Sequence, residues 1–339
     1  MRNAGEGGRG PTMLERAGTA AADAGRGETR RPRLRMVVRW GFVVLILGFL
    51  VGFVVTQWDQ LPSFDWRFRP GWLALAAAGV VLFYAIHAEA WRAIVRGLGA
   101  DLDGAPARAV WGKSILARYV PTNALMVVGR VLMAERLGVG RRICLASLVY
   151  ELGLALSAAI VVAAYFVITM PALEDQPARY AVLAVVPLAL AVLHPRVFRR
   201  GADFALAKLG REPLPAVLSP ARVATLLIVY IVSWIAVGTG VFGFASALHP
   251  VAAEDFPYVA AAQAVGFGVA VVTFVSPSGL GTRDAALAAA LAAVLPLAVA
   301  TAIAVGFRLF QTAVELAFVG VVDVGGSRGC RPHSDASFP

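Results

Sequence analysis

Charged residues are scarce in this chain of 339 residues, and lysine is almost absent from it. Asp, Glu, Lys and Arg make up 15% of the residues, against roughly 25% in a typical soluble domain, while 59% are hydrophobic. Lys113 and Lys208 are the only lysines. A soluble chain of this length would need a larger core than its surface-to-volume ratio permits. The composition therefore excludes an ordinary soluble enzyme and indicates an integral membrane protein.

Cysteine is equally rare, because Cys144 and Cys330 are the only two. Cys144 opens an apolar run and Cys330 lies near the C-terminus, so the pair supports neither a disulfide framework nor a zinc site. The chain has only four histidines and no His-rich cluster. We expect no metal and no cofactor.

Negative charge is in the minority, and the net charge of +10 is carried mainly by arginine. A basic chain can bind nucleic acid. Here, however, the arginines cluster beside apolar runs, as the cytoplasmic anchors of membrane proteins do. We therefore expect no nucleic-acid partner. The scarcity of lysine beside abundant Ala, Gly, Val and Arg is typical of a GC-rich bacterial genome.

Long apolar runs are abundant, and runs of about 18 or more residues are typical of membrane-spanning helices. The sequence predicts an all-α membrane protein with about six full spans. These cover residues 36–56, 71–91, 143–170, 179–193, 221–248 and 295–322.

The charges between the runs orient the predicted spans. Arg30, Arg31, Arg33 and Arg35 precede the first run, and the connections 92–142 and 194–222 are strongly basic. Basic segments stay on the cytoplasmic side. We therefore expect a multi-pass protein of the cytoplasmic membrane with both termini inside. Its parts would be a disordered basic N-terminus (1–35), a membrane domain (36–325) and a short cytoplasmic tail (326–339).

Two apolar segments are interrupted by turn-forming residues. The segment 107–138 is broken around Pro121, and the segment 258–294 is broken around Pro277, Gly279 and Gly281. Proline removes a helical hydrogen bond, and glycine adopts dihedral angles that other residues avoid. Each segment is predicted to form two half-helices folded back as a re-entrant hairpin.

The two predicted hairpins enter from opposite sides of the membrane, and each is followed by a long span. This pairing indicates an inverted repeat. Interrupted segments at corresponding places in two halves of a transporter point to a binding site near the membrane midplane.

Two motifs at these breaks resemble a known family. The first comprises Tyr119-Val120-Pro121, Gly129-Arg130 and Tyr150-Glu151-Leu152; the second is Ser276-Pro277-Ser278-Gly279-Leu280-Gly281-Thr282-Arg283-Asp284-Ala285. They resemble the signatures of the lysylphosphatidylglycerol synthase transmembrane family, or flippase-like proteins, over about residues 36–322. The chain differs from the family pattern at Thr122-Asn123-Ala124, Ser278 and Asp284.

The resemblance implies a function in lipid movement. Family members with an added soluble domain transfer an aminoacyl group from tRNA to phosphatidylglycerol, and their membrane part moves the product across the bilayer. This sequence ends soon after its last predicted span, without a transferase part. The resemblance therefore implies translocation and not synthesis, and we expect no enzymatic activity.

Arg283 is the foremost candidate for binding a lipid phosphate. It follows Thr282, which is predicted as the helix N-cap, and precedes Asp284 in the first turn. Helix N-termini bind anions, and a guanidinium binds phosphate through two donors. The alternative is local: Asp284 complements the helix dipole while Arg283 extends to the interface.

A polar stripe lies on the last predicted span. Arg308, Gln311, Thr312 and Glu315 are spaced i, i+3, i+4 and i+7, and therefore share one helix face. A charge at the bilayer centre costs at least about 2.5 kcal/mol on insertion scales, so this face should line a cavity or meet a partner. Arg308 is predicted to bind phosphate. Gln311, Glu315 and Asp284 are predicted as its partners in the cavity. The alternative is a structural link between Arg308 and Glu315.

Arg130 and Glu151 are the remaining charged candidates. Glu151 lies inside an apolar run, and we predict that it lines the cavity as a proton-coupled switch or as a site for a cationic headgroup. Its alternative is a structural pairing with Arg130 or Arg308. Arg130 is predicted to bind phosphate, and its alternative is a solvated position on a surface helix.

Other polar and aromatic residues receive no functional role. His87 and Glu89 are expected at the cytoplasmic interface. Trp58, Trp66, Trp72 and Trp91 are expected to form an interfacial belt.

Three functions remain open from the sequence. The first is a flippase or scramblase for an anionic phospholipid or a polyprenyl-phosphate lipid. The second is an intramembrane enzyme of lipid-linked glycan metabolism, for which Asp101 and Asp103 are the nearest acidic pair. The third is a non-catalytic partner of envelope glycosyltransferases or lipid synthases.

Overall fold

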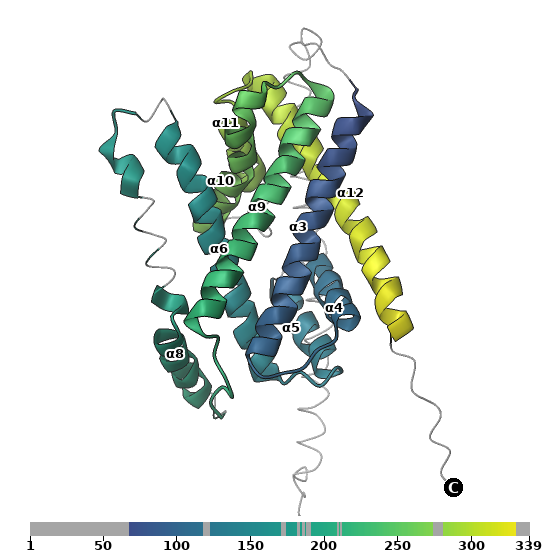
Figure 1. Cartoon of the computed structure of the whole chain (residues 1–339), viewed down its shortest axis with the longest axis vertical. Helices are drawn as coiled ribbons and strands as arrows, with labels where there is room; N and C mark the ends of the chain where they lie inside the picture. Colours follow the sequence, from purple (N-terminus) through teal and green to yellow (C-terminus); the bar gives the residue numbers. More distant parts are fainter. Residues whose placement is uncertain are drawn as a thin grey trace, which may run out of the picture. The chain divides into compact units, whose positions relative to one another are not determined.

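The computed structural model describes residues 68–117, 123–170, 174–181, 184, 187, 191–208, 210, 212–273 and 281–329. Within these ranges the secondary structure is helical and contains no strand, which confirms the all-α class (Figure 1). The elements are α3 (Pro70–Gly97), α4 (Gly104–Leu116), α5 (Asn123–Glu135), α6 (Arg141–Thr169), η4 (Pro177–Ala181), α8 (Pro195–Lys208), α9 (Pro220–Leu248), η5 (Ala253–Asp255), α10 (Phe256–Thr273), α11 (Thr282–Leu291) and α12 (Leu297–Gly329).

Four helices of the described ranges are long and apolar enough to cross a membrane: α3, α6, α9 and α12. The 29 residues of α6 and of α9 measure about 43 Å, which exceeds a hydrocarbon core of about 30 Å. Four of the predicted spans are thereby confirmed as helices. The predicted span 36–56 lies outside the described residues, and 179–193 is described only in part. The number of spans therefore stays a prediction.

Proline and serine set the starts of the long helices. Pro70 and Pro220 occupy the first turn of α3 and α9, where the missing N–H costs no hydrogen bond. Ser219 precedes α9, and its hydroxyl accepts a hydrogen bond from the backbone N–H of Arg222 at 3.3 Å. This side chain satisfies one of the free donors at the start of the helix.

Glycines allow α3, α9 and α10 to approach closely. A Cβ atom on Gly79 of α3 would lie 2.5 Å from the carbonyl oxygen of Ala236 in α9. A Cβ atom on Gly238 of α9 would lie 2.4 Å from the carbonyl oxygen of Ala260 in α10. Small residues at such contacts are typical of membrane helices, which associate mainly by close packing.

The midpoints of the long helices meet in one layer, called here the central layer. The ring of Trp234 in α9 lies 5.8 Å from that of Phe83 in α3, and its indole N–H donates to the carbonyl of Ala155 in α6 at 2.9 Å. Phe267 of α10 lies 5.0 Å from the Trp234 ring. These contacts give a depth scale for the polar residues described below.

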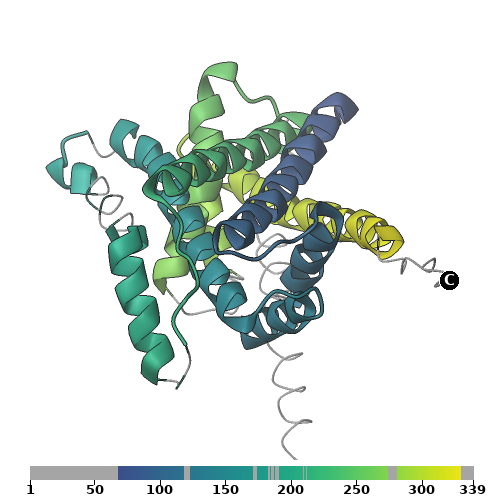
Figure 2. The same cartoon turned by 60° about the horizontal axis from the view of Figure 1, so that its bottom comes forward.

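Helices α4 and α5 flank the first predicted break and pack against each other. Helix α4 runs antiparallel to α3, because Arg108 pairs with Glu89 near the C-terminal end of α3 while the ring of Trp111 lies 6.3 Å from that of Tyr84. Tyr84 follows Phe83 in the central layer. Helix α4 therefore lies along the C-terminal half of α3, with α5 beside α4 (Figure 2).

Helices α10 and α11 flank the second predicted break and pack closely. Helix α10 runs antiparallel to α9, from Phe256 beside Phe242 (5.2 Å between ring centroids) to Phe267 in the central layer. The ring of Phe242 is 5.7 Å from that of Trp72, near the start of α3. The two helix pairs therefore lie toward opposite ends of α3 (Figure 1).

The turns themselves, including Pro121, Pro277 and Gly279, lie outside the described residues. The structure confirms helices on both sides of each break. The re-entrant course and the inverted repeat stay predictions.

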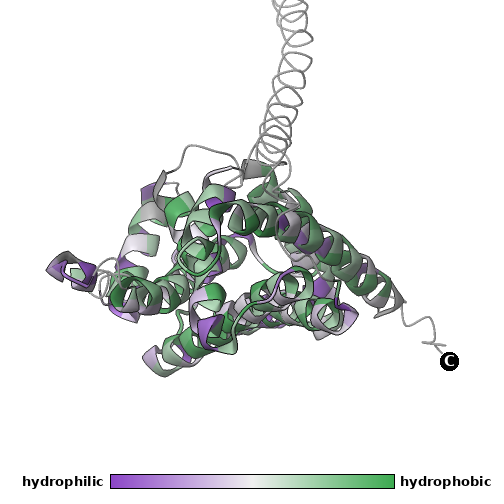
Figure 3. Ribbon diagram, turned by 90° about the horizontal axis from the view of Figure 1, so that it is seen from above, coloured by the Kyte–Doolittle hydropathy of each residue, from purple (hydrophilic) through white to green (hydrophobic). Residues whose placement is uncertain are grey.

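Large apolar side chains are exposed along the long helices. Examples are Leu82 of α3, Ile228 of α9 and Leu316 of α12, which are 50%, 61% and 53% exposed. Apolar residues cover much of the ribbon in Figure 3. An extensive exposed apolar surface is typical of contact with lipid.

Candidate functional site

The start of α11 positions Arg283. Gly281 has φ +86°, a conformation that favours glycine, and it is the N-cap of the helix. The prediction of Thr282 as N-cap is therefore wrong by one residue, because Thr282 already belongs to the first turn. The carboxylate of Asp284 accepts a hydrogen bond from the backbone N–H of Gly281 at 3.4 Å. Asp284, 5% exposed, thus bonds back to the N-cap backbone, while Gly281 has no side chain that could complete a capping box.

A crevice between α10, α11 and α12, called here the α10–α12 crevice, brings together four of the predicted site residues. It is lined by Gln263, Arg283, Asp284, Leu287, Ala304, Phe307, Arg308 and Gln311. Two arginines, one aspartate and two glutamines therefore line one narrow space, which in this structure is too small for a water molecule. The sequence predicted Arg283, Asp284, Arg308 and Gln311 for the site, and the structure adds Gln263.

The crevice lies close to the central layer. A Cβ atom on Gly266 of α10 would lie 2.9 Å from the carbonyl oxygen of Arg283, and the next residue, Phe267, contacts Trp234. The amide of Gln263 donates to the side-chain oxygen of Gln311 at 3.4 Å. Both glutamines are almost fully buried. The crevice thus combines cationic and amide donors at mid-depth.

Glu315 lies one turn beyond Gln311 and is fully buried. Its carboxylate accepts a hydrogen bond of 2.6 Å from the hydroxyl of Tyr84, which connects α12 to α3. The ring of Tyr84 also packs 5.8 Å from that of Phe318. The predicted inward orientation of this helix face is therefore confirmed for Gln311 and Glu315.

Arg130 belongs to a second cluster, the α5–α6 cluster, which is formed by Arg130, Glu151, Ser114, Trp91 and Trp111. Arg130 as a whole residue is 1% exposed, so the alternative of a solvated surface arginine is wrong. Its guanidinium forms an ion pair with Glu151 and donates through Nε to the hydroxyl of Ser114 at 2.7 Å. It also lies 5.4 and 5.9 Å from the ring centroids of Trp91 and Trp111.

Both oxygens of Glu151 have donors in this cluster. Trp111 donates its indole N–H to one oxygen at 2.7 Å, while the other faces Arg130. The structural pairing of Glu151 with Arg130, given above as an alternative, is therefore present. Arg130 thus has its contacts within the α5–α6 cluster, whereas Arg283 and Arg308 line the α10–α12 crevice. The phosphate-binding role of Arg130 stays an untested prediction.

Two residues of α3 are buried although the sequence predicted them at the membrane interface. Trp91, expected in an interfacial belt, is fully buried and donates to the hydroxyl of Ser147 at 3.0 Å. His87, expected at the interface, is 8% exposed and lies 3.2 Å from the hydroxyl of Ser233 in α9. Tyr84, His87 and Trp91 are spaced i, i+3 and i+7. This spacing is a signal for an inward polar face that the sequence already contained.

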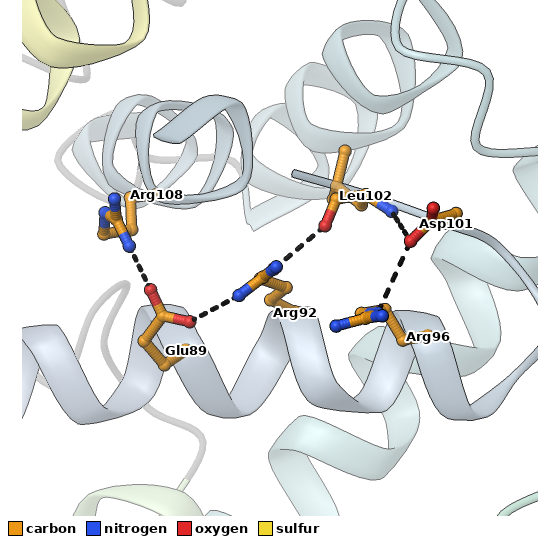
Figure 4. A network of polar contacts seen from close by, with 6 residues as sticks. All are labelled: Glu89, Arg92, Arg96, Asp101, Leu102 and Arg108. Atoms are coloured by element: carbon orange, nitrogen blue, oxygen red, sulfur yellow. Dashed lines mark hydrogen bonds and ion pairs between the residues drawn. The ribbon is translucent and has the colours of Figure 1, made fainter. Parts of the chain in front are cut away.

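A surface network joins α3 to the start of α4 (Figure 4). Glu89 pairs with Arg92 and Arg108, and Nε of Arg92 donates to the carbonyl of Leu102 at 2.9 Å. These contacts fix the loop between α3 and α4 and thereby the position at which α4 begins.

Asp101 belongs to the same network and was the nearest acidic candidate for catalysis. Its carboxylate accepts from the backbone N–H of Leu102 at 3.1 Å and lies 3.4 Å from Arg96. Asp103 precedes α4 as its N-cap residue. Both acids therefore have local structural positions at the surface. Among the described residues, no group of three or more His, Cys, Asp and Glu is arranged to hold a metal ion.

Comparison with known proteins agrees with the motifs. Residues 36–318 match the family described as the lysylphosphatidylglycerol synthase TM region. The match includes α3 to α11 and most of α12, and therefore both the α10–α12 crevice and the α5–α6 cluster. No curated protein matches the chain.

Proposed function

Because the chain belongs to the lysylphosphatidylglycerol synthase transmembrane family, a membrane domain of lipid-related proteins, we propose that it is a lipid translocase and not an enzyme. Its substrate would be an anionic phospholipid or a polyprenyl-phosphate lipid. The observation that carries the proposal is the presence of Arg283 and Arg308 in one crevice close to the central layer.

The chemistry of the crevice fits a phosphate group. Two guanidinium groups offer paired donors to its oxygens, and the start of α11 contributes backbone N–H groups and the positive end of the helix dipole. Gln263 of α10 and Gln311 of α12 add neutral amides. Asp284 would balance one arginine while the site is empty and would disfavour a second negative charge on the ligand.

The depth of the crevice fits a headgroup in transit. A charge costs at least about 2.5 kcal/mol at the centre of a bilayer, so a lipid phosphate crosses slowly unless cations accompany it. The acyl or polyprenyl chains can stay in the surrounding lipid, because they need no polar path. The helix pairs α4–α5 and α10–α11 would move relative to the long spans, opening the headgroup site to either side in turn. The α5–α6 cluster would fasten α4 and α5 to α3 and α6 in one of the two arrangements, and it would open in the other.

The cellular setting belongs to the same proposal. We place the protein in the cytoplasmic membrane with both termini on the cytoplasmic side. Its partners would be the lipid substrate and the envelope glycosyltransferases or lipid synthases that produce or consume it.

Reconstitution tests the proposal. Purified protein would be placed in proteoliposomes with labelled phosphatidylglycerol or a labelled polyprenyl phosphate, and the exchange of headgroups between leaflets would be followed by chemical quenching. We expect fast exchange with the unaltered protein and loss of exchange with Arg283→Ala. The matched control is Arg136→Ala, which removes an exposed arginine next to α5 and should leave exchange unchanged. Absence of exchange for every lipid in the unaltered protein would instead favour the enzyme or partner-subunit hypotheses.

A further inference from the structure

Helix α8 is amphipathic, and its polar face is strongly basic. One face carries Arg196, Arg199, Arg200 and Asp203, and the other carries Val197, Phe198, Gly201 and Ala202. Helices with a basic face and an apolar face are typical of the membrane interface, where the apolar side enters the boundary of the acyl chains.

An apolar groove, called here the α6–α8 groove, separates α8 from the N-terminal half of α6. Its apolar arm has a volume of about 430 Å³, within the range of small-molecule sites. Its apolar arm is lined by Leu145, Ala146, Val149, Val192, Val197, Phe198, Gly201, Ala202, Leu206 and Leu214. The rings of Tyr150 and Phe198 stack at 3.9 Å and hold the two helices together. Val149 and Val197 on the facing walls are 54% and 50% exposed, so the groove is open to an apolar occupant.

A polar arm continues the groove at the start of α6. The two arms share Arg142, Leu145 and Leu206, and the polar arm, of about 790 Å³, adds Glu135, Arg141, Gly210 and Glu212. The four charged side chains form two ion pairs, Arg141 with Glu135 and Arg142 with Glu212 at 3.0 Å. The polar arm therefore offers both cations and anions around one space.

We propose that the α6–α8 groove binds one zwitterionic phospholipid that carries a primary ammonium group. An acyl chain lies in the apolar arm. The phosphate faces Arg141 and Arg142, since guanidinium groups bind phosphate oxygens through paired donors. The ammonium faces Glu135 and Glu212, which leaves each charge of the headgroup beside an opposite charge of the protein. An anionic headgroup would meet these two carboxylates without compensation.

This site is distinct from the α10–α12 crevice, with which it shares no residue. Its lipid is a bound component of the fold and not the transported substrate. The proposal therefore does not depend on translocation and can fail or hold separately from it.

Native mass spectrometry tests the site. The protein would be purified in mild detergent, equilibrated with equal amounts of phosphatidylethanolamine, phosphatidylglycerol and a neutral glycolipid, and examined for retained lipid. We expect one retained phosphatidylethanolamine. Gly201→Trp and Val149→Trp fill the apolar arm from opposite walls, and a Cβ atom at Gly201 meets nothing within 4 Å. Each should lower retention about tenfold, because acyl-chain contact supplies most of the affinity of a bound lipid.

The controls separate the groove from general effects. Leu316→Trp places the same bulk on an exposed apolar position of α12 outside the groove and should retain the lipid. Glu212→Gln removes one anion of the polar arm and should shift retention toward phosphatidylglycerol. Retention that is equal for all three lipids, or unchanged in both groove-filling variants, would overturn the proposal. An unaltered protein that retains no lipid would overturn it too.

Discussion

The buried ion pair of Arg130 and Glu151 gives the sharpest test of how the first helix pair is held. We consider two single substitutions, Arg130→Met and Glu151→Gln, and their combination. The side chain of Arg130 is 2% exposed and that of Glu151 is 13% exposed. Each substitution keeps a similar side-chain volume and removes one charge.

Glu151→Gln should be the more damaging single change. It leaves the guanidinium of Arg130 buried without its counter-charge, and breaking a buried pair in this way costs about 3–5 kcal/mol. Contacts with the rings of Trp91 and Trp111 offset about 1–2 kcal/mol at most of this loss. Arg130→Met should cost less, because Glu151 is partly exposed and keeps the indole donor of Trp111 at 2.7 Å.

The double variant should recover part of the stability, since it buries neither charge alone. The cycle of the four proteins should give a favourable coupling energy of about 1–3 kcal/mol. The measurement is the free energy of unfolding in detergent micelles, followed by denaturant titration. Purely additive costs, or an Arg130→Met variant less stable than Glu151→Gln, would refute the reasoning that the pair stabilises the α5–α6 cluster by charge compensation.

Two further substitutions test contacts between other helices, again by the free energy of unfolding in micelles. Gly238→Ala should destabilise the fold by about 1–3 kcal/mol, because a Cβ atom there would lie 2.4 Å from the carbonyl oxygen of Ala260. The matched control is Gly129→Ala, since a Cβ atom at Gly129 has no atom within 4 Å. The control should leave stability unchanged or raise it by up to about 1 kcal/mol. Tyr84→Phe should cost about 1–3 kcal/mol by removing a donor from the buried carboxylate of Glu315. An unchanged stability of Gly238→Ala would contradict the close approach of α9 and α10. An unchanged stability of Tyr84→Phe would contradict the hydrogen bond between Tyr84 and Glu315.

The apolar runs predicted the four long helices because hydropathy over a span is a property of the sequence itself. The breaks likewise predicted where α4 ends before α5 and where α10 ends before α11. Which side chains of different helices contact one another was much harder to predict from the sequence. Spacing placed Gln311 and Glu315 on one face of α12, but it could not reveal that Tyr84 would meet that face.

Contacts between helices also decide which arginines belong to the α10–α12 crevice and which to the α5–α6 cluster. Arg283 was the foremost predicted phosphate ligand, and Arg130 and Arg308 were predicted beside it, since each lies near a motif or inside an apolar run. Tertiary packing separates them: Arg130 lies beside Glu151 between two tryptophans, while Arg283 and Arg308 line a crevice. His87 and Trp91 were misplaced because position along a span predicts depth, whereas the rotation of the helix decides burial.

The most direct measurement compares two lipids in the same proteoliposomes, one with a phosphate group and one without. Exchange of phosphatidylglycerol and of a neutral glycosyl diacylglycerol would be followed for the unaltered protein and for the double variant Arg283→Ala, Arg308→Ala. The account predicts that the double variant loses phosphatidylglycerol exchange and keeps whatever exchange of the neutral lipid the unaltered protein supports. An equal loss for both lipids, or unchanged exchange of phosphatidylglycerol, would contradict the claim that these two arginines hold the phosphate.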